Sequence, residues 1–323
     1  MGRNKFDLII PVVFKDYGML SRVLRYVMKY IYPDNIYIIT DTRFRKYLPK
    51  EAQRMRVVDE NVLLPGLSFS RIRNLLKQSG NMDSRPGWYL QQFIKMGFAL
   101  SDYSQNRYYL SWDADTIPLR KLDFFVDGKV MFAMKKEFHK PYFDTIKRIL
   151  NISGFNEKSY IAEHMMFDKQ IMADLIGRIS SCGVRGEDWI EKIINAVEPG
   201  VSNGFSEFET YGSFCLNYYP LSYVERHLNT FRKGGYIAGR FISKQRLECI
   251  SFDTDTISFE LNDYPDVWTA RCFCFLYRKY VEMRYRWISH ILPPPPQWLI
   301  NINIPQGRCV LSAYFLSKER EVA

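Results

Sequence analysis

The chain has 323 residues, of which 47% are hydrophobic and 16% aromatic, and its formal net charge at pH 7 is +10. The apolar content suffices for one large domain, or for a domain with an appended lobe, and the positive charge predicts an anionic partner. We expect no nucleic-acid partner, because recognition-helix, zinc-finger and RNP-like motifs are absent. An anionic membrane surface or a phosphorylated small molecule is the better expectation.

The cysteines and the N-terminal run predict the compartment. The six cysteines are scattered and lack C-x-x-C spacing, so we expect reduced thiols and a cytoplasmic protein. No apolar run approaches the roughly 18 residues that a membrane span needs. The first run is interrupted by Pro11 and does not match a signal peptide. We expect a soluble protein, at most peripheral on the inner face of the cytoplasmic membrane.

The N-terminal elements predict a βαβ unit. A β-branched run over 6–14 predicts a buried strand, helical spacing of apolar residues predicts a helix over 19–31, and 36–40 predicts a second strand. Strand, helix and strand in this order indicate a parallel α/β sheet. A basic segment over 43–58 follows, and 55–64 holds a further short strand.

The rest of the chain continues the alternation and then changes character. In chain order we predict a helix over 87–100, strands over 107–112 and 128–134, a strand over 160–168 that enters a helix, a helix over 186–197, a turn and helix over 202–219, and short strands and loops over 220–262. The run 267–292 is amphipathic, aromatic and basic, and four prolines end it. We therefore predict an α/β domain over 1–262 and a helical extension over 263–323.

Two aspartates, Asp113 and Asp115, end the apolar run YYLSW. Carboxylates one residue apart can share a cation when the middle residue takes a turn conformation, and Mg²⁺ or Mn²⁺ prefers such oxygen ligands together with substrate phosphates. The D-x-D motif alone is weak, since acidic turns are common. Its place at the end of a strand after a βαβ unit strengthens it. A second pair, Asp253 and Asp255, is interpreted as a polar hairpin turn.

Acidic residues in the string FSEFETYG are the candidates for acid–base chemistry. Ser206 and Glu209 match a capping box, so a structural role for Glu209 is as good an interpretation as a catalytic one. Glu207 is freer to face a cleft and is the first choice for the base, with Glu209 second. Glu187 and Asp188 stand in a first helical turn, where acids complement the helix dipole.

Two further features have two interpretations each. His164 follows an alternating strand and is either a hydrogen-bonded core residue or a residue that lines the acceptor side of a site. The run 267–292 is either a core-packing helix with a solvated basic face or a peripheral membrane contact beside a lipid-linked acceptor.

Several strings, taken together and in order, resemble one known family. They are IIPVVFKDYGMLSRVLRYVMKYIYPDNIYIITD, GWYLQQFIKMGFA, YYLSWDADTIPL, AEHMMFD and GFSEFETYGSF, within residues 5–260. The chain resembles a family of bacterial GT-A-fold glycosyltransferases from capsule and lipopolysaccharide clusters, long classed as a domain of unknown function. D-x-D is shared by many families, whereas W-Y-L-Q-Q and S-E-F-E-T-Y-G are more specific.

The resemblance implies a GT-A fold, a Rossmann-like mixed sheet flanked by helices. It also implies a metal-dependent hexosyltransferase that moves a sugar from a nucleotide-sugar donor, a UDP-sugar first, to a cell-surface polysaccharide or lipid-linked glycan. The implied positions are Pro11, Val12 and Asp16 for the edge that holds the base, Gln91, Gln92 and Lys95 for the sugar diphosphate, and Asp113 and Asp115 for Mn²⁺ or Mg²⁺ and the diphosphate. A third metal ligand, which some GT-A enzymes have, has only His227 and His290 as candidates.

Other function classes stay open from the residues alone. A phosphatase of the haloacid dehalogenase type would use Asp113 as nucleophile, although Ile117 stands where that pattern has Thr or Val. A non-catalytic membrane- or glycan-binding protein would explain the basic, aromatic C-terminal run. A sugar-nucleotide pyrophosphorylase is disfavoured, because no Gly-rich phosphate loop follows the first strand.

Overall fold

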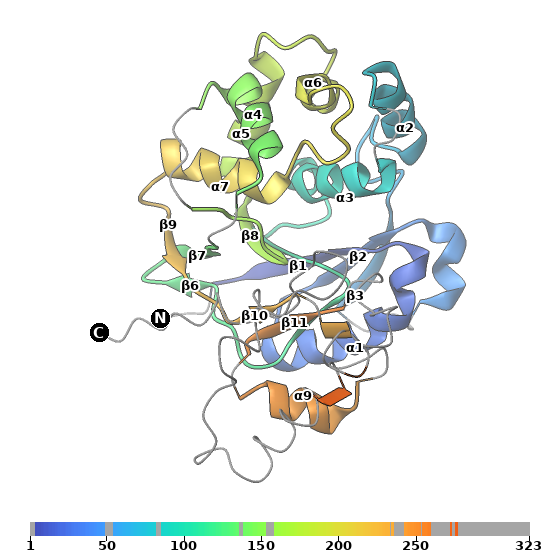
Figure 1. Cartoon of the computed structure of the whole chain (residues 1–323), viewed down its shortest axis with the longest axis vertical. Coiled ribbons are helices and arrows are strands. Elements are labelled where there is room, and N and C mark those ends of the chain that lie inside the picture. The colour runs from blue at the N-terminus through green and yellow to red at the C-terminus, as the bar shows by residue number, and fades with distance from the viewer. Residues whose placement is uncertain are drawn as a thin grey trace. The chain divides into compact units, whose positions relative to one another are not determined.

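A sheet flanked by helices forms a Rossmann-like α/β fold, as the sequence predicts (Figure 1). The computed structural model describes residues 4–48, 54–81, 85–135, 138–152, 158–232, 234–235, 242–252 and 254–259, together with 272, 275 and 276. The chain divides into two compact units. The first contains Met1–Gly18, Pro33–Ala114 and Asp123–Arg226, and the second contains Met19–Tyr32, Asp115–Leu122 and His227–Ala323.

A five-stranded sheet of order β3-β2-β1-β4-β8 is the centre of the first unit. Its strands are β1 (Phe6–Pro11), β2 (Ile36–Thr40), β3 (Met55–Asp59), β4 (Tyr108–Trp112) and β8 (His164–Asp168). The first four are parallel, and β8 runs antiparallel to β4. The chain steps outward from β1 to β3 and returns as β4 on the other side of β1. The strand order therefore reverses between β1 and β4, the switch point where open α/β sheets bind ligands.

Burial explains the continuous apolar runs of this sheet. Every residue of β1, β2 and β8 is buried, so these strands do not alternate apolar with polar residues. Asp7 is the exception in β1, and its carboxylate is satisfied by Asn35 (3.0 and 2.8 Å), Ser104 (2.5 Å) and Asn106 (3.0 Å). A buried carboxylate needs such partners, because each lost hydrogen bond leaves a desolvated charge.

Six α-helices of the first unit lie together above the five-stranded sheet in Figure 1. They are α2 (Phe69–Gln78), α3 (Pro86–Gly97), α4 (Lys140–Leu150), α5 (Lys169–Ser181), α6 (Trp189–Ala196) and α7 (Glu207–Tyr218). Helix α3 packs against β1, α2 and α7. The sequence analysis did not predict α2 or α4; α2 buries only Ile72 and Leu76, a stripe too narrow to stand out.

A smaller sheet of order β6-β7-β9 completes the first unit. Its strands are β6 (Phe125–Val126), β7 (Lys129–Ala133) and β9 (Tyr223–Arg226). Strands β6 and β7 form an antiparallel pair, and β9 joins β7 in parallel. Strand β7 also packs against β8, which connects this sheet to the larger one.

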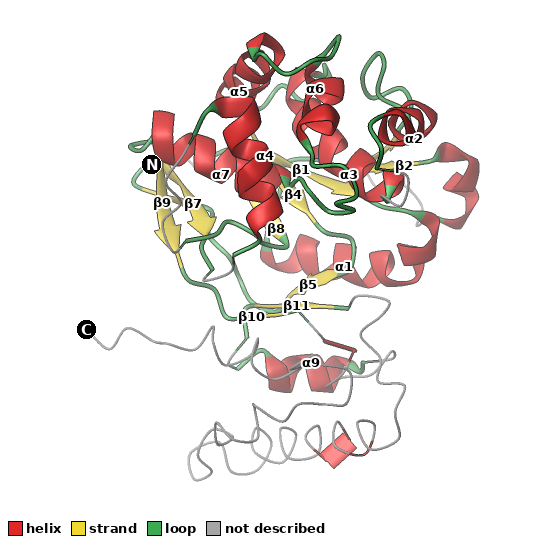
Figure 2. Cartoon of the chain, turned by 45° about the horizontal axis from the view of Figure 1, so that its top comes forward, coloured by secondary structure: helices red, strands yellow, loops and turns green. Residues whose placement is uncertain are grey.

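Among the residues that the structure describes, the second unit contains short strands and the helices α1 (Tyr17–Tyr30) and α9 (Lys244–Ile250) (Figure 2). Strands β5 (Thr116–Pro118), β11 (Thr256–Ser258) and β10 (Thr230–Phe231) form one sheet of order β10-β11-β5. Most of α1 and all of α9 belong to this unit, and α9 was not predicted.

The predicted extension lies almost entirely outside the described residues. Within the run 267–292, only Cys272, Phe275 and Leu276 are described, and the residues on both sides of the predicted domain boundary after residue 262 are not described. Both therefore stay predictions. Among the helices that the structure describes, none is long and apolar enough to cross a membrane.

Candidate functional site

Asp113 lies at the switch point of the five-stranded sheet. It directly follows β4, and its N–H donates to the Glu163 carbonyl (3.0 Å), which extends the pairing with β8 by one residue. The register of β1 and β4 pairs Ile9 with Ser111, so Pro11 stands opposite Asp113 where both strands end. The sequence analysis placed Asp113 at the end of a strand, and this placement is confirmed.

The ammonium of Lys95, on α3, bridges two carboxylates. Its Nζ lies 2.8 Å from Asp113 Oδ1 and 2.8 Å from Glu207 Oε1. It also lies 4.3 Å from the centroid of the Phe208 ring, a cation–π contact. We call these four residues the Lys95 cluster. The side chains of Lys95 and Glu207 are 9% and 5% exposed, whereas that of Asp113 is 35% exposed.

The charges of the cluster hold Lys95 protonated. Burial by itself would lower the pKa of Lys95, but the carboxylates of Asp113 and Glu207 outweigh it and raise this pKa above its ordinary value. Lys95 is therefore a fixed cation at physiological pH. With two carboxylates around one ammonium, the cluster carries one net negative charge when both acids are ionised.

A hydrogen bond from the backbone of α7 to a side chain of α3 also joins the two helices at this cluster. Pro86 begins α3, at the position where a missing N–H costs nothing. Gln92 Oε1 accepts a hydrogen bond from the Glu207 N–H (3.1 Å). Ser206 is the N-cap of α7 and accepts from the Glu209 N–H (3.3 Å), which confirms the half of the predicted capping box that the Ser206 hydroxyl forms.

The two acids at the start of α7 are both buried. We expected Glu207 to face a cleft freely, and this is corrected: its side chain is buried, because Lys95 reaches it from another helix. Glu209 is 1% exposed, and its Oε2 accepts hydrogen bonds from Ser159 Oγ (2.6 Å) and the Tyr160 N–H (3.0 Å). These contacts favour the structural interpretation of Glu209.

His164 lies in the core and not on an open acceptor side, which corrects the second of its two interpretations. Its ring is 3% exposed and stacks on Trp112 at 4.6 Å between centroids. Burial, then Arg226, lower the pKa of His164 to about 3, with Glu163 opposing. Within the described part of the chain, neither ring nitrogen has a hydrogen-bond partner.

Gln91 lies on α3, and Asp188 directly precedes α6. Gln91 is half-buried on α3, beside Gln92 of the same helix. Asp188 is the N-cap of α6, accepting from the Glu191 N–H (3.0 Å), and its other oxygen pairs with Arg71 (2.7 Å). The structural interpretation of Asp188 is confirmed.

Asp115 belongs to the second unit, because the boundary between the units falls after Ala114. Its Oδ1 accepts a hydrogen bond from Thr116 Oγ1 (3.3 Å), and its carbonyl accepts from the Phe259 N–H (3.0 Å). Asp255 of the same unit accepts from the Asn229 N–H (2.8 Å) in the bend between α9 and β11, so the predicted hairpin is corrected: the element before this bend is a helix and not a strand. Its companion in the second D-x-D, residue 253, lies outside the described residues.

The donor set does not fit a divalent ion held at Asp113 by protein ligands alone. Among the described residues, no group of three His, Cys, Asp or Glu side chains could hold a metal ion. Asp113 Oδ1 is already bound by Lys95, whose charge repels a second cation at short range. Of the candidate third ligands, His227 is exposed in the second unit and His290 lies outside the described residues. The Mn²⁺ or Mg²⁺ site at Asp113 and Asp115 stays a prediction.

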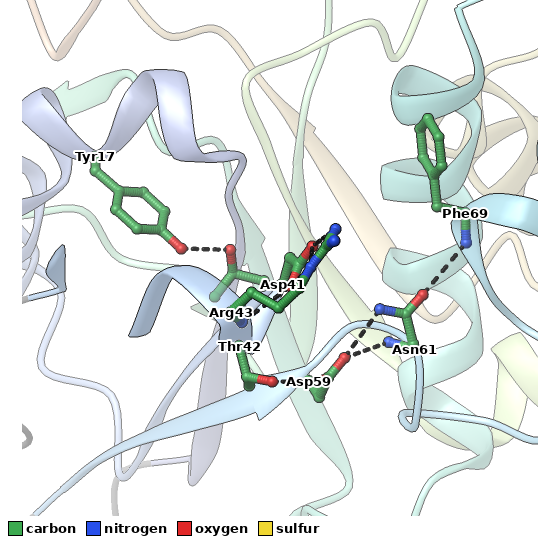
Figure 3. A network of polar contacts seen from close by, with 8 residues as sticks. Tyr17, Asp41, Thr42, Arg43, Asp59, Asn61 and Phe69 are labelled. Atoms are coloured by element: carbon green, nitrogen blue, oxygen red, sulfur yellow. Dashed lines mark hydrogen bonds and ion pairs between the residues drawn. The ribbon is translucent and has the colours of Figure 1, made fainter. Parts of the chain in front are cut away.

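A polar network joins the carboxyl ends of β2 and β3 (Figure 3). The Asp59 carboxylate accepts hydrogen bonds from the Thr42 hydroxyl and from the Asn61 N–H (2.9 Å). Asn61 Oδ1 in turn accepts from the Phe69 N–H at the start of α2 (3.4 Å). The Tyr17 and Thr40 hydroxyls lie 2.7 Å apart at the end of β2. The network fixes the loops that follow both strands.

Glu60 titrates near neutrality beside this network. Its pKa is raised from 4.5 to about 7, first by burial and then by the negative charges of Asp41 and Asp59. Arg43 opposes the shift, and its guanidinium pairs with Asp41 (2.5 Å). The carboxyl edge of β2 and β3 therefore holds three acids close enough to influence each other.

Aromatic rings lie exposed at the same edge. Phe14, in the 3₁₀ helix η1 (Phe14–Asp16), stacks on Phe44 at 4.6 Å and contacts Tyr47 at 5.2 Å. Phe44 and Tyr47 belong to the second 3₁₀ helix, η2 (Thr42–Tyr47). Phe14 is 47% and Tyr47 54% exposed, which is unusual for aromatic side chains that contact each other.

The residues predicted for the base-binding edge lie beside these rings. Pro11 ends β1, and the Val12 N–H donates to the Ile39 carbonyl (2.9 Å), so both are buried backbone positions. Asp16 ends η1, and burial raises its pKa against the opposing charge of Lys15. The aromatic residues Phe14, Phe44 and Tyr47 and the acids Asp41, Asp59 and Glu60 were not predicted as site residues. An acid at or after three parallel strands, at Asp41, Asp59 and Asp113, was the signal that could have found this edge.

Residues 3–233 match a family model described as "Family of unknown function (DUF6492)". The chain belongs to this family. The match includes every residue of the Lys95 cluster and of the edge formed by β1, β2 and β3. In the comparison with curated proteins, no sequence matches the chain. Because the family description names no activity, the function has to be inferred from the site itself.

Proposed function

We propose that the protein is a glycosyltransferase that moves a sugar from a nucleotide-sugar donor, with a UDP-sugar as the first candidate, to a cell-surface polysaccharide or lipid-linked glycan. The observation that carries the proposal is the Lys95 cluster at the switch point, where ligands of open α/β sheets bind. The resemblance of five strings to GT-A glycosyltransferases supports the same activity.

The two ends of a nucleotide sugar differ in chemistry, and so do two parts of the carboxyl edge. A nucleobase is a flat ring that stacks on aromatic side chains, and Phe14 and Tyr47 offer exposed rings beside β1 and β2. Ribose hydroxyls donate hydrogen bonds to carboxylates, and Asp41 and Glu60 lie at the same edge. The sugar end meets the Lys95 cluster, where Asp113 is the carboxylate exposed enough to accept from sugar hydroxyls.

Transfer requires a group that takes the proton of the acceptor hydroxyl when that oxygen attacks the sugar carbon. Asp113 is the base in this proposal, because it is the carboxylate of the Lys95 cluster that is exposed enough to reach an acceptor hydroxyl, and Lys95 holds it in one orientation through a contact of 2.8 Å. Such positioning matters because a carboxylate displaced by about 1 Å loses roughly a hundredfold in rate. Running the transfer assay with and without Mn²⁺ measures directly whether the reaction requires the ion.

The first test measures binding. A thermal-shift screen measures the unfolding midpoint of the protein with UDP, GDP or CMP, each with and without Mn²⁺. One nucleotide should raise this midpoint, because a ligand that binds only the folded state stabilises it. The protein is then incubated with a panel of nucleotide sugars and glycan acceptors, and the release of free nucleotide is measured. A protein that shows no shift with any nucleotide but binds liposomes would support the non-catalytic alternative instead.

The second test measures transfer by variants. D113N should lose roughly a hundredfold or more of the transfer rate. D144N makes the same change at Asp144, whose partner Lys140 has a side chain that is 72% exposed, and it should keep the rate. A D113A/D115A double variant that keeps full transfer would refute the predicted metal role. Phosphate release from simple phosphoesters, without transfer, would favour the haloacid dehalogenase alternative.

A further inference from the structure

We infer that the ammonium of Lys95 occupies the place between the carboxylates of Asp113 and Glu207 and thereby prevents this pair from binding a divalent ion. One Nζ contacts both carboxylates at 2.8 Å. The two oxygens therefore lie within twice that distance of each other, on elements far apart in the chain. Carboxylate oxygens bind Mg²⁺ and Ca²⁺ at about 2.0–2.6 Å, so only a small inward shift would let one divalent ion take the place of the ammonium.

The surroundings of Nζ show that Lys95 is held in this position. An ammonium has three N–H donors, and two of them reach Asp113 Oδ1 and Glu207 Oε1. The ammonium also packs over the Phe208 ring at 4.3 Å. If the ammonium moved away, the carboxylates of Asp113 and Glu207 would repel each other without a counter-charge, and the side chain of Glu207 is only 5% exposed to solvent. Lys95 is thus a positioning residue that supplies locally the charge that a divalent ion would otherwise supply.

A second lysine of the first unit provides a matched control. Lys135 Nζ lies 2.6 Å from Glu163 Oε1, and the two side chains are 13% and 5% exposed, similar to Lys95 and Glu207. Replacing Lys135 removes a buried lysine from one carboxylate, whereas replacing Lys95 removes it from two. The comparison separates the loss of a buried charge from the opening of a carboxylate pair.

The experiment measures Mn²⁺ binding without any donor, by the loss of the free-ion signal in electron paramagnetic resonance. We expect K95M to bind one Mn²⁺ about tenfold or more tightly than the unchanged protein, and its unfolding midpoint to rise with Mn²⁺. The double variant K95M/E207Q should lose this gain, and K135M should show none. A folded K95M, checked by circular dichroism, that binds no more Mn²⁺ than the unchanged protein would overturn the inference.

The unchanged protein gives an independent test should K95M fail to fold. Its Mn²⁺ binding is compared with that of D113N: equal binding supports the inference, and a loss of binding in D113N overturns it. Since no sugar nucleotide is involved, a failed transferase assay leaves this inference standing. In the same way, Asp113-dependent Mn²⁺ binding would leave the proposed transferase activity standing.

Discussion

Replacement of His164 by phenylalanine should remove a specific pH dependence of stability. The imidazole is 3% exposed and stacks on Trp112 at 4.6 Å, and a phenyl ring can keep that stack. In the folded state the pKa of His164 is about 3, because burial opposes the charged form. In the unfolded chain the pKa of a histidine is about 6.5.

These two values set the sign and the size of the effect. Below about pH 6.5 the unfolded chain takes up a proton that the folded state does not, so stability is lost as the pH falls toward the folded pKa. The slope approaches about 1.4 kcal/mol per pH unit, and between about pH 7 and pH 5 the loss is roughly 2 kcal/mol. H164F should lack this part of the acid destabilisation.

Urea unfolding at about pH 7 and pH 5 measures the difference for each protein. H139F is the matched control, since the His139 ring is half-buried and its Nε2 lies 3.0 Å from the Asn203 carbonyl oxygen. H164F should lose roughly 2 kcal/mol less on acidification than the unchanged protein, and H139F measures how much of that difference the replacement of another histidine would cause. If H164F and H139F lose the same amount, the buried neutral imidazole is not the cause.

Two further predictions concern packing and a raised carboxyl pKa. A Cβ at Gly212 would clash with the Tyr160 ring, so G212A should cost about 1–3 kcal/mol in urea unfolding, whereas G177A in α5, with open space at that position, should gain about 0.5–1 kcal/mol; equal effects would contradict the packing argument. The pKa of Glu60 is raised to about 7 in the folded state, so between about pH 4.5 and pH 7 the unfolded chain is ionised while the folded protein stays protonated. The contribution of Glu60 to stability is therefore fully present below about pH 4.5 and is lost as the pH rises through about 7. Thermal melts should show the unchanged protein losing stability relative to E60Q over that range, and parallel curves would contradict it.

Local pattern determined most elements of the first unit. The strand over 36–40 has the predicted bounds. Continuous apolar runs predict the strands β1, β2 and β4, and helical spacing of apolar residues predicts α1 and α3. The N-cap Ser206 also needed only its neighbours, because the capping bond runs to the Glu209 N–H within one turn. Helix α2, with two buried residues, was missed because its apolar stripe is narrow, whereas α4 was missed although it buries five residues.

The tertiary structure decided what the site residues contact. No local rule indicates that Lys95 will meet Asp113 and Glu207, because the three come from α3, from the end of β4 and from α7. Ion pairing acts over a few ångströms in space and has no period along the chain, so the sequence could name these residues as candidates without joining them. Burial is likewise a property of packing, and it turned Glu207 from a presumed free base into one side of a buried ion pair.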